Sequence, residues 1–164
     1  MLERSLILLK PDTVQRGLMG RILCRFEDVG LKIVGCKMVW VDKDHAAAHY
    51  ADVAQRRGEK VFDQNVRFLT EGPVLAIVVE GIHAIDQVRK MIGPTEPKSA
   101  LPGTIRGDFT HQSFAYADVH DQVIRNLVHA SSSQEDAQRE IPLWFTPEEV
   151  HTYTSVHDRH VLGK

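Results

Sequence analysis

His129 stands where a histidine side chain could act as a nucleophile. Leu127 and Val128 have the apolar character of the end of a buried strand, and the three serines at 131–133 are N-cap candidates for a helix. A strand end that faces the amide donors of a helix N-terminus favours anions, above all phosphate. A structural histidine at a strand end is the plainer interpretation of His129 alone, so the case for chemistry depends on other residues.

A carboxylate that could orient this histidine follows closely in the chain. Apolar residues recur at helical spacing from Gln134 to Trp144, which predicts a helix that carries Glu140. From that helix Glu140 could reach back to one nitrogen of the His129 ring. A neutral imidazole that is held by a carboxylate is a good nucleophile or general base near pH 7.

Cationic and hydroxyl side chains occur on predicted loops and element ends, where ligands commonly bind. They are Lys10, Arg89, Thr95 and Arg106. Each alone is most often a solvated surface group, but together with His129 they could bind a polyphosphate, because arginine matches phosphate oxygens bidentately. The sequence has no G-x-x-x-x-G-K-[ST] motif, so side chains rather than a P-loop would hold the phosphates.

The pattern of apolar residues predicts an α+β fold. Strands are expected at 5–9, 31–41 and 74–79 and just before His129, and helices at 20–29, 44–55, 61–69, 83–92 and 134–144. Pro11 is expected to end the first strand. Residues 98–108 are expected to form a loop, and residues 109–123 an irregular excursion. The region from Thr146 is expected to begin with a short helix or turn and to continue as an irregular tail. This order predicts a ferredoxin-like, split-βαβ, four-stranded antiparallel sheet with helices on one face. A Rossmann sheet is disfavoured because no glycine fingerprint follows the first strand.

Composition is that of one ordinary globular domain over residues 1–164. Hydrophobic residues make up 43%, charged residues 26%, and the net charge of −2 argues against a general nucleic-acid binder. No apolar run has the length of a membrane helix, the N-terminus lacks a signal-peptide pattern, and a cytoplasmic location is expected. Cys24 and Cys36 are expected to be free buried thiols, and most of the nine histidines surface residues without zinc-ligand spacing.

At this point the sequence resembles the nucleoside diphosphate kinase family, nearly from end to end. The resemblance depends on motifs that occur in the family's order: Lys10-Pro11-Asp12, Gly72-Pro73, Arg89 with Thr95, Pro102-Gly103-Thr104-Ile105-Arg106-Gly107-Asp108-Phe109, Asn126-x-x-His129-x-Ser131, Glu140-Ile141 and Trp144-Phe145. A chance match to this whole set is very improbable.

The resemblance implies a ferredoxin-like core and a ping-pong phosphoryl transfer. His129 matches the histidine that takes the γ-phosphate of a nucleoside triphosphate and passes it to a diphosphate. Glu140 matches the glutamate that fixes its tautomer, and Ser131 a hydroxyl neighbour. The remaining matches are Tyr50, near the transferred phosphate; Lys10, Arg89, Thr95 and Arg106, on the phosphates; and Lys10 and Asn126, on the ribose. Mg²⁺ held mainly by the phosphates and water is implied, as is a hexamer or tetramer.

Three departures from the family pattern concern affinity and assembly rather than the reaction. The common His-Gly-Ser-Asp-Ser is His-Ala-Ser-Ser-Ser here, which loses an acidic residue at the helix start. The stretch from Tyr50 to Gly72 is longer than usual, so either Phe62 or Val61 takes the place of the phenylalanine that stacks on the base. The segment 110–125 is also longer than the common form.

Three other functions are weighed against this one. A catalytically silent nucleotide-binding member would normally lack the histidine, and His129 is present. A nucleic-acid-binding ferredoxin-like domain would carry aromatic residues on its strands, where this chain has few. A phosphohistidine relay carrier would discharge only to a protein partner, whereas a nucleotide kinase discharges to a diphosphate.

Overall fold

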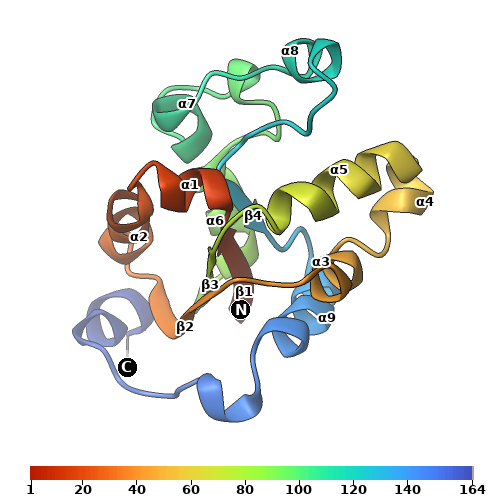
Figure 1. Ribbon diagram of the computed structural model, residues 1–164. Helices are drawn as coiled ribbons and strands as arrows, with labels where there is room; N and C mark the ends of the chain where they lie inside the picture. The colour runs from red at the N-terminus through yellow and green to blue at the C-terminus, as the bar shows by residue number, and fades with distance from the viewer. Residues whose placement is uncertain (164) are drawn as a thin grey trace.

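The computed structural model describes residues 1–163, and a four-stranded antiparallel sheet lies at its centre (Figure 1). The strands are β1 (Leu2–Leu9), β2 (Lys32–Val39), β3 (Val74–Ile82) and β4 (Val128–Ala130), in the order β2-β3-β1-β4. Every neighbouring pair is antiparallel, and β4 pairs with the end of β1 so that Leu8 lies opposite His129. The ferredoxin-like prediction is therefore confirmed, and the parallel Rossmann alternative is excluded.

Helices lie between β1, β2, β3 and β4 and follow β4. They are α1 (Pro11–Gln15), α2 (Met19–Asp28), α3 (Lys43–His49), α4 (Val53–Arg57), α5 (Glu59–Leu69), α6 (Ala84–Ile92), α7 (Ile105–Phe109), α8 (Phe114–Val119) and α9 (Gln134–Trp144), with short helical turns η1 (Pro97–Ser99), η2 (Pro147–Glu149) and η3 (Asp158–Leu162). No described helix is long and apolar enough to cross a membrane.

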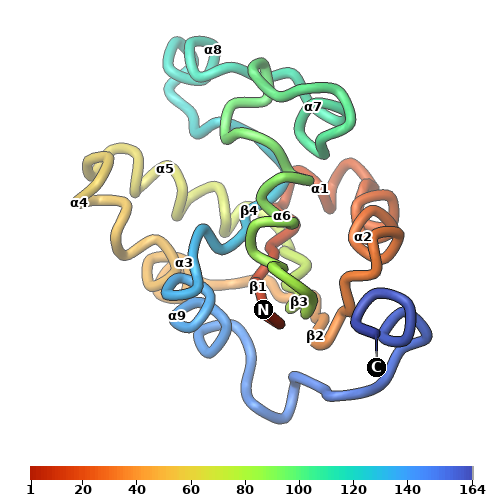
Figure 2. Tube along the Cα trace, turned by 180° about the vertical axis from the view of Figure 1, so that it is seen from behind, coloured from red at the N-terminus to blue at the C-terminus, as the bar shows by residue number. Residues whose placement is uncertain are grey.

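Helices cover both faces of the sheet, so the expectation of one covered face is wrong. The side chains of β1 alternate, as in any strand: Ile7 and Leu9 pack with Phe26 of α2, while Leu6 and Leu8 belong to the cluster on the other face. All four of these β1 residues are fully buried. The predicted continuous apolar run was therefore the sign of a strand between two helical layers. Figures 1 and 2 show α3 and α9 side by side on one flank and α2 on the other.

Several segments differ from their predicted form. Pro11 does not only end a strand but is the first residue of α1, where its missing N–H costs nothing. The helix expected over 44–55 is two helices, because α3 ends before Tyr50 and α4 begins at Val53. Thr104 caps α7 within the expected loop, and Ser113 caps α8 within the expected irregular excursion.

Two further expectations need correction. Cys24, on α2, and Cys36, on β2, are free but exposed rather than buried, because both point away from the two core clusters. The C-terminal tail is ordered against β2: the hydroxyl of Tyr153 donates to the Ile33 carbonyl at 2.7 Å, and the Lys32 amine lies 3.5 Å from the Asp158 carboxylate.

Candidate active site

His129 lies in the middle of β4 and borders a cavity of about 600 Å³. Its side chain is 24% exposed, in contrast to its neighbours Val128 and Ala130, which are buried. Alternation along the short strand places those two in the core and turns the histidine to the open side. The strand thus presents an imidazole to solvent on a rigid element.

A chain of hydrogen bonds fixes this imidazole. Glu140 Oε1 lies 3.0 Å from His129 Nε2, and Glu140 Oε2 accepts from the Ser131 hydroxyl at 2.7 Å. The Ser131 hydroxyl in turn accepts from the backbone N–H of Leu6 at 3.1 Å, which connects this series of hydrogen bonds to β1. Because an ionised carboxylate only accepts hydrogen bonds, Nε2 carries the proton and Nδ1 keeps its lone pair. Nδ1 is therefore the ring nitrogen that is free to act as a nucleophile.

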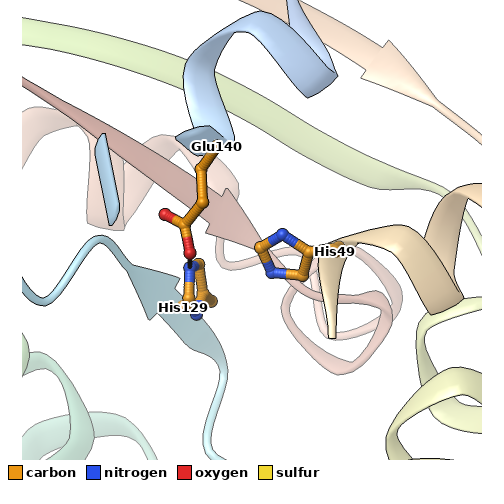
Figure 3. Close-up of side chains that lie close together, drawn as sticks. All are labelled: His49, His129 and Glu140. Carbon is orange, nitrogen blue, oxygen red and sulfur yellow. Dashed lines mark hydrogen bonds and ion pairs between the residues drawn. The ribbon is translucent and has the colours of Figure 1, made fainter. Parts of the chain in front are cut away.

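His49 packs edge-on against the His129 ring (Figure 3), with ring centroids 4.5 Å apart and planes at 87°. Trp144 Nε1, which can only donate, bonds His49 Nδ1 at 3.3 Å. Burial, together with the nearby His129 and Lys10, holds the pKa of His49 well below its usual value, so its ring is neutral and its proton sits on Nε2. That N–H is buried and has no partner in the described part of the chain.

His49, His129 and Glu140 are the kinds of residue that bind transition metals, and their ligand atoms lie within 4.8 Å of one another. Their hydrogen bonds argue against a metal centre. Trp144 engages the lone pair of His49 Nδ1, and Nε2 of the same ring is protonated. His129 Nε2 is bonded to Glu140. His49 and Glu140 are therefore better explained as a polar support for the His129 ring.

Lys10 and Asn126 stand together beside the histidine. Lys10, at the end of β1, is buried, and its amine donates to the Asn126 side-chain oxygen at 2.8 Å. The Asn126 amide donates onward to the Thr95 carbonyl at 2.8 Å. Burial, partly offset by the charge of Asp12, lowers the pKa of Lys10 to about 8. The site thus contains a cation that can lose its charge near neutral pH.

Arg106, the second residue of α7, is a buried guanidinium with a double role. It donates to the carbonyls of Asn126 at 3.1 Å, Gly93 at 2.7 Å and Val128 at 2.6 Å. Burial and the neighbouring Arg89 lower its pKa to about 10, so it stays charged at neutral pH. Three of its five N–H groups are used by these bonds, and the other two remain for a phosphate in the cavity.

The cavity gathers nearly all the residues that the sequence singled out. Its walls include the candidate phosphate, ribose and catalytic residues Lys10, Tyr50, Arg89, Thr95, Arg106, Asn126, His129 and Glu140. Ser131 lies behind Glu140 rather than in the wall. Burial raises the pKa of Tyr50, so its phenol stays protonated and able to donate, and its oxygen has no partner among the described residues.

The far end of the cavity lies between α5 and the segment that carries α8. Val61 and Phe62, neighbours on α5, both pack against the core cluster on that side of the sheet, but of the two Val61 alone also lines the cavity. Phe114 and Val123 also contribute to this wall. Of the two candidates for the base contact, Val61 is thus the one that the structure brings to the cavity.

Sequence reasoning missed His49, and it missed that the buried Asp12 carboxylate accepts the backbone N–H of Leu127. A signal for His49 was present, because Ala46, His49 and Val53 recur at helical spacing and Tyr50 is adjacent, which marks a buried helix face. A signal for Asp12 was also present, because Pro11 before it is a typical first residue of a helix. Arg56 and Arg57 of α4, which the sequence analysis did not single out, also line the cavity.

A histidine with a free ring nitrogen, a carboxylate bonded to its other nitrogen and several buried or half-buried cations around one cavity are typical of a phosphoryl-transfer enzyme, here on a ferredoxin-like sheet. A family model described as nucleoside diphosphate kinase matches residues 3–150. A nucleoside diphosphate kinase from Borreliella burgdorferi is 46% identical over 155 residues, which cover 93% of each chain. One from Thermococcus kodakarensis is 50% identical over 157 residues, covering 96% of this chain and 84% of the relative.

Solved structures agree with the sequence relatives. A transition-state mimic of the Borrelia burgdorferi enzyme with bound vanadate and ADP has a TM-score of 0.96 at 44% identity, covering 98% of this chain and 97% of that one. The Halobacterium salinarum enzyme in complex with CDP has a TM-score of 0.85 at 38% identity, covering 98% and 99%. This chain belongs to the nucleoside diphosphate kinase family and transfers phosphoryl groups between nucleotides.

Proposed function

We propose that His129 Nδ1 attacks the γ-phosphate of a nucleoside triphosphate and releases the diphosphate. The phosphohistidine then passes its phosphoryl group to a second nucleoside diphosphate, in a ping-pong cycle. The observation that carries this assignment is the Glu140 bond to Nε2, which leaves Nδ1 with its lone pair at the cavity wall. Glu140 and Ser131 orient the ring throughout.

The cations of the cavity supply what phosphoryl transfer needs most, which is positioning and charge neutralisation. We assign the nucleotide phosphates to Lys10, Arg89, Thr95 and Arg106, and the ribose hydroxyls to Lys10 and Asn126. Tyr50 stands beside the transferred group. The bond between Lys10 and Asn126 supports this pairing, because it places an amine and an amide oxygen on one side of the nucleophile.

Mg²⁺ would be held mainly by the nucleotide phosphates and water. The carboxylates in the cavity wall are Asp52, Asp118, Asp136 and Glu140. Three are already engaged: Asp52 with Arg56, Asp136 with Arg139, and Glu140 with His129. This is not a carboxylate cage, and it fits the preference of Mg²⁺ for phosphate oxygens and retained waters. When bound, the ion would neutralise charge on the β- and γ-phosphates.

Incubation with γ-labelled ATP tests the function. We expect label on the protein that is stable to alkali and lost in acid, as is typical of phosphohistidine, and its discharge to added nucleoside diphosphate. Label that discharges only to another protein would indicate a relay carrier. Complete absence of label would indicate a silent nucleotide-binding member.

Glu140→Gln should slow both half-reactions without abolishing labelling. The amide weakens the orientation of the His129 ring, and lost supporting partners of this kind cost about 10- to 100-fold. Single-turnover labelling and discharge would measure the two steps. Glu148→Gln, at an exposed carboxylate after α9, is the matched control and should leave both rates unchanged. A folded Glu140→Gln protein that takes no label would contradict a purely orienting role.

Purine and pyrimidine substrates, ribo and deoxy, should be accepted within about two orders of magnitude in kcat/KM. The base end of the cavity offers Val61 for apolar contact, and apolar contact discriminates weakly. Its nearest amides are partly used: Gln64 donates to Asp121 and Asn65 to the Val61 carbonyl. Kinetics with adenine, guanine, cytosine, uracil and thymine diphosphates would test this. A preference beyond about a thousandfold for one base would instead implicate the 110–125 segment in selection.

Three wider expectations accompany this function. We propose that the chain acts as one nucleoside diphosphate kinase domain and that it works as a homo-oligomer, a hexamer or tetramer. Sedimentation would measure the assembly. The cytoplasmic location stays a prediction, which fractionation of the source cells would test.

A further inference from the structure

The backbone just before the nucleophile makes a strained turn. Leu127 has a φ of 70°, in the left-handed region that a side chain other than glycine rarely adopts. The N–H of Val128 donates to the carbonyl of Asn126 at 2.8 Å, two residues back. Together these define a γ-turn with a left-handed central residue, a rare and strained form. Such a conformation persists only where its surroundings enforce it.

The turn sits between two groups of the proposed site. Asn126, its first residue, bonds the Lys10 amine, and His129 follows its last residue directly. The side chain of Leu127 is fully buried, so the turn cannot relax by moving outward. Its geometry therefore sets the position of Asn126 relative to His129.

Two residues of α1 and the preceding lysine hold Leu127 from both sides. Its carbonyl accepts from the Lys10 N–H at 2.9 Å and from the Thr13 hydroxyl at 2.7 Å. Its N–H donates to Asp12 Oδ2 at 3.1 Å. The other oxygen, Asp12 Oδ1, accepts from the Thr13 N–H at 3.1 Å, which locks the carboxylate on the first turn of α1. Asp12 is the side chain that binds the N–H of the strained residue.

We propose that Asp12 is a positioning residue for the phosphoryl-transfer site: its buried carboxylate holds the γ-turn at Leu127 and thereby places Asn126 and His129. The inference rests on the proposed function for its kinetic consequences. The geometry itself does not depend on that function.

Asp12 also acts on Lys10 through its charge. Among the charged and titratable groups around Lys10, Arg106 opposes its positive charge and Asp12 favours it, the neutral His49 lies close by, and Tyr50 lines the same cavity. Burial raises the pKa of Asp12 itself. The charge of Lys10, hydrogen bonds from two backbone N–H groups and the charge of Arg125 counteract this rise. Removing the Asp12 charge should lower the pKa of Lys10 further and move the loss of activity at high pH to a lower pH.

Two substitutions separate the hydrogen bond from the charge. Asp12→Asn removes the charge and keeps one of the two acceptor oxygens, which can still take the Leu127 N–H, whereas Asp12→Ala removes the charge and both acceptors. The matched control is Glu149→Gln, because Glu149 also accepts a backbone N–H, that of Thr146 at 2.9 Å, and pairs with Lys37 at 2.6 Å. Glu149 lies on a different face, away from the cavity.

The measurement is kcat per phosphorylatable site, with the labelled fraction as the site count, alongside KM and a pH profile of kcat/KM. We expect Asp12→Ala to lower kcat by about 10- to 100-fold, as loss of a supporting partner does. Asp12→Asn should recover part of that loss, because one acceptor remains for the Leu127 N–H, and its alkaline limb should begin at a lower pH than in the wild type. Glu149→Gln should match the wild type in both readouts.

Hydrogen exchange at the Leu127 amide is the readout that does not depend on activity. It should accelerate in Asp12→Ala and remain slow in Asp12→Asn and the control. If the wild type takes up no label, the proposed function fails, but the exchange rate of the Leu127 amide still tests whether Asp12 holds the γ-turn. A wild-type kcat and pH profile in Asp12→Ala, or an unchanged Leu127 exchange rate, would overturn the proposal. If Asp12→Ala does not fold, Asp12→Asn decides through its pH limb.

Discussion

His129→Ala should lose at least about a thousandfold in kcat, the scale on which removal of a nucleophile acts. The variant should also take up no label from γ-labelled ATP. The physical reason is that the described cavity wall offers a single imidazole whose Nδ1 lone pair is left free by its partners. His49, the neighbouring ring, has Nδ1 engaged by Trp144 and cannot replace it.

The comparison must separate lost chemistry from lost structure. Binding of ADP and the melting temperature of His129→Ala should stay close to those of the wild type, because this side chain is partly exposed and belongs to neither core cluster. His83→Ala, at an exposed histidine before α6, is a suitable control and should be fully active. Normal labelling of His129→Ala would refute the assignment of the nucleophile.

Lys10→Gln should reduce kcat/KM by about 100- to 1,000-fold, the scale of removing one preorganised donor to a developing charge. The amine is buried beside Asn126, so a water molecule cannot take its place in the variant. The melting temperature at pH 7 should not fall, because a buried charge that destabilises the folded state is removed. An active Lys10→Gln protein would remove Lys10 from the phosphate site.

Titration of the same lysine should be visible in the pH dependence of kcat/KM. Because burial lowers the pKa of Lys10 to about 8, the free enzyme loses this positive charge as pH rises through that value. kcat/KM should therefore decline above about pH 8, whereas kcat should hold to higher pH, since a bound phosphate favours the charged amine. The decline of kcat/KM above about pH 8 should be absent in Lys10→Gln. This difference distinguishes titration of Lys10 from titration of the nucleotide itself, which would affect both proteins. Parallel limbs in both proteins would contradict the assignment.

Local pattern predicted much of the fold, because apolar periodicity reflects which face of each element is buried. The strands around Leu8 and Ile77, the helix α9 and the antiparallel order of the sheet follow from it. The same pattern could not show which elements cover each sheet face. A run such as Leu6 to Leu9 is apolar on both sides and so indicates burial on both, but only the packing partners reveal which helices provide it.

Irregular segments were the harder part. The cap residues Thr104 and Ser113 start short helices whose stability comes from contacts rather than from length. For example, Glu96 accepts from the Phe114 N–H at 2.9 Å and so anchors the start of α8. A short helix that depends on a distant carboxylate has little signal of its own in the sequence.

The sequence by itself determined the chemical inventory: a histidine, a glutamate and a set of cations in an order that matches one family. Only the tertiary structure decided which nitrogen of His129 is free, since that depends on Glu140 and Ser131 meeting it across β4 and α9. It also decided the charge state of Lys10 and the strained turn at Leu127. Both arise from contacts between residues more than a hundred positions apart in the chain, such as Lys10 with Asn126 and Asp12 with Leu127. Burial, tautomer and backbone strain are properties of a packed environment, and no local spacing of residues specifies them.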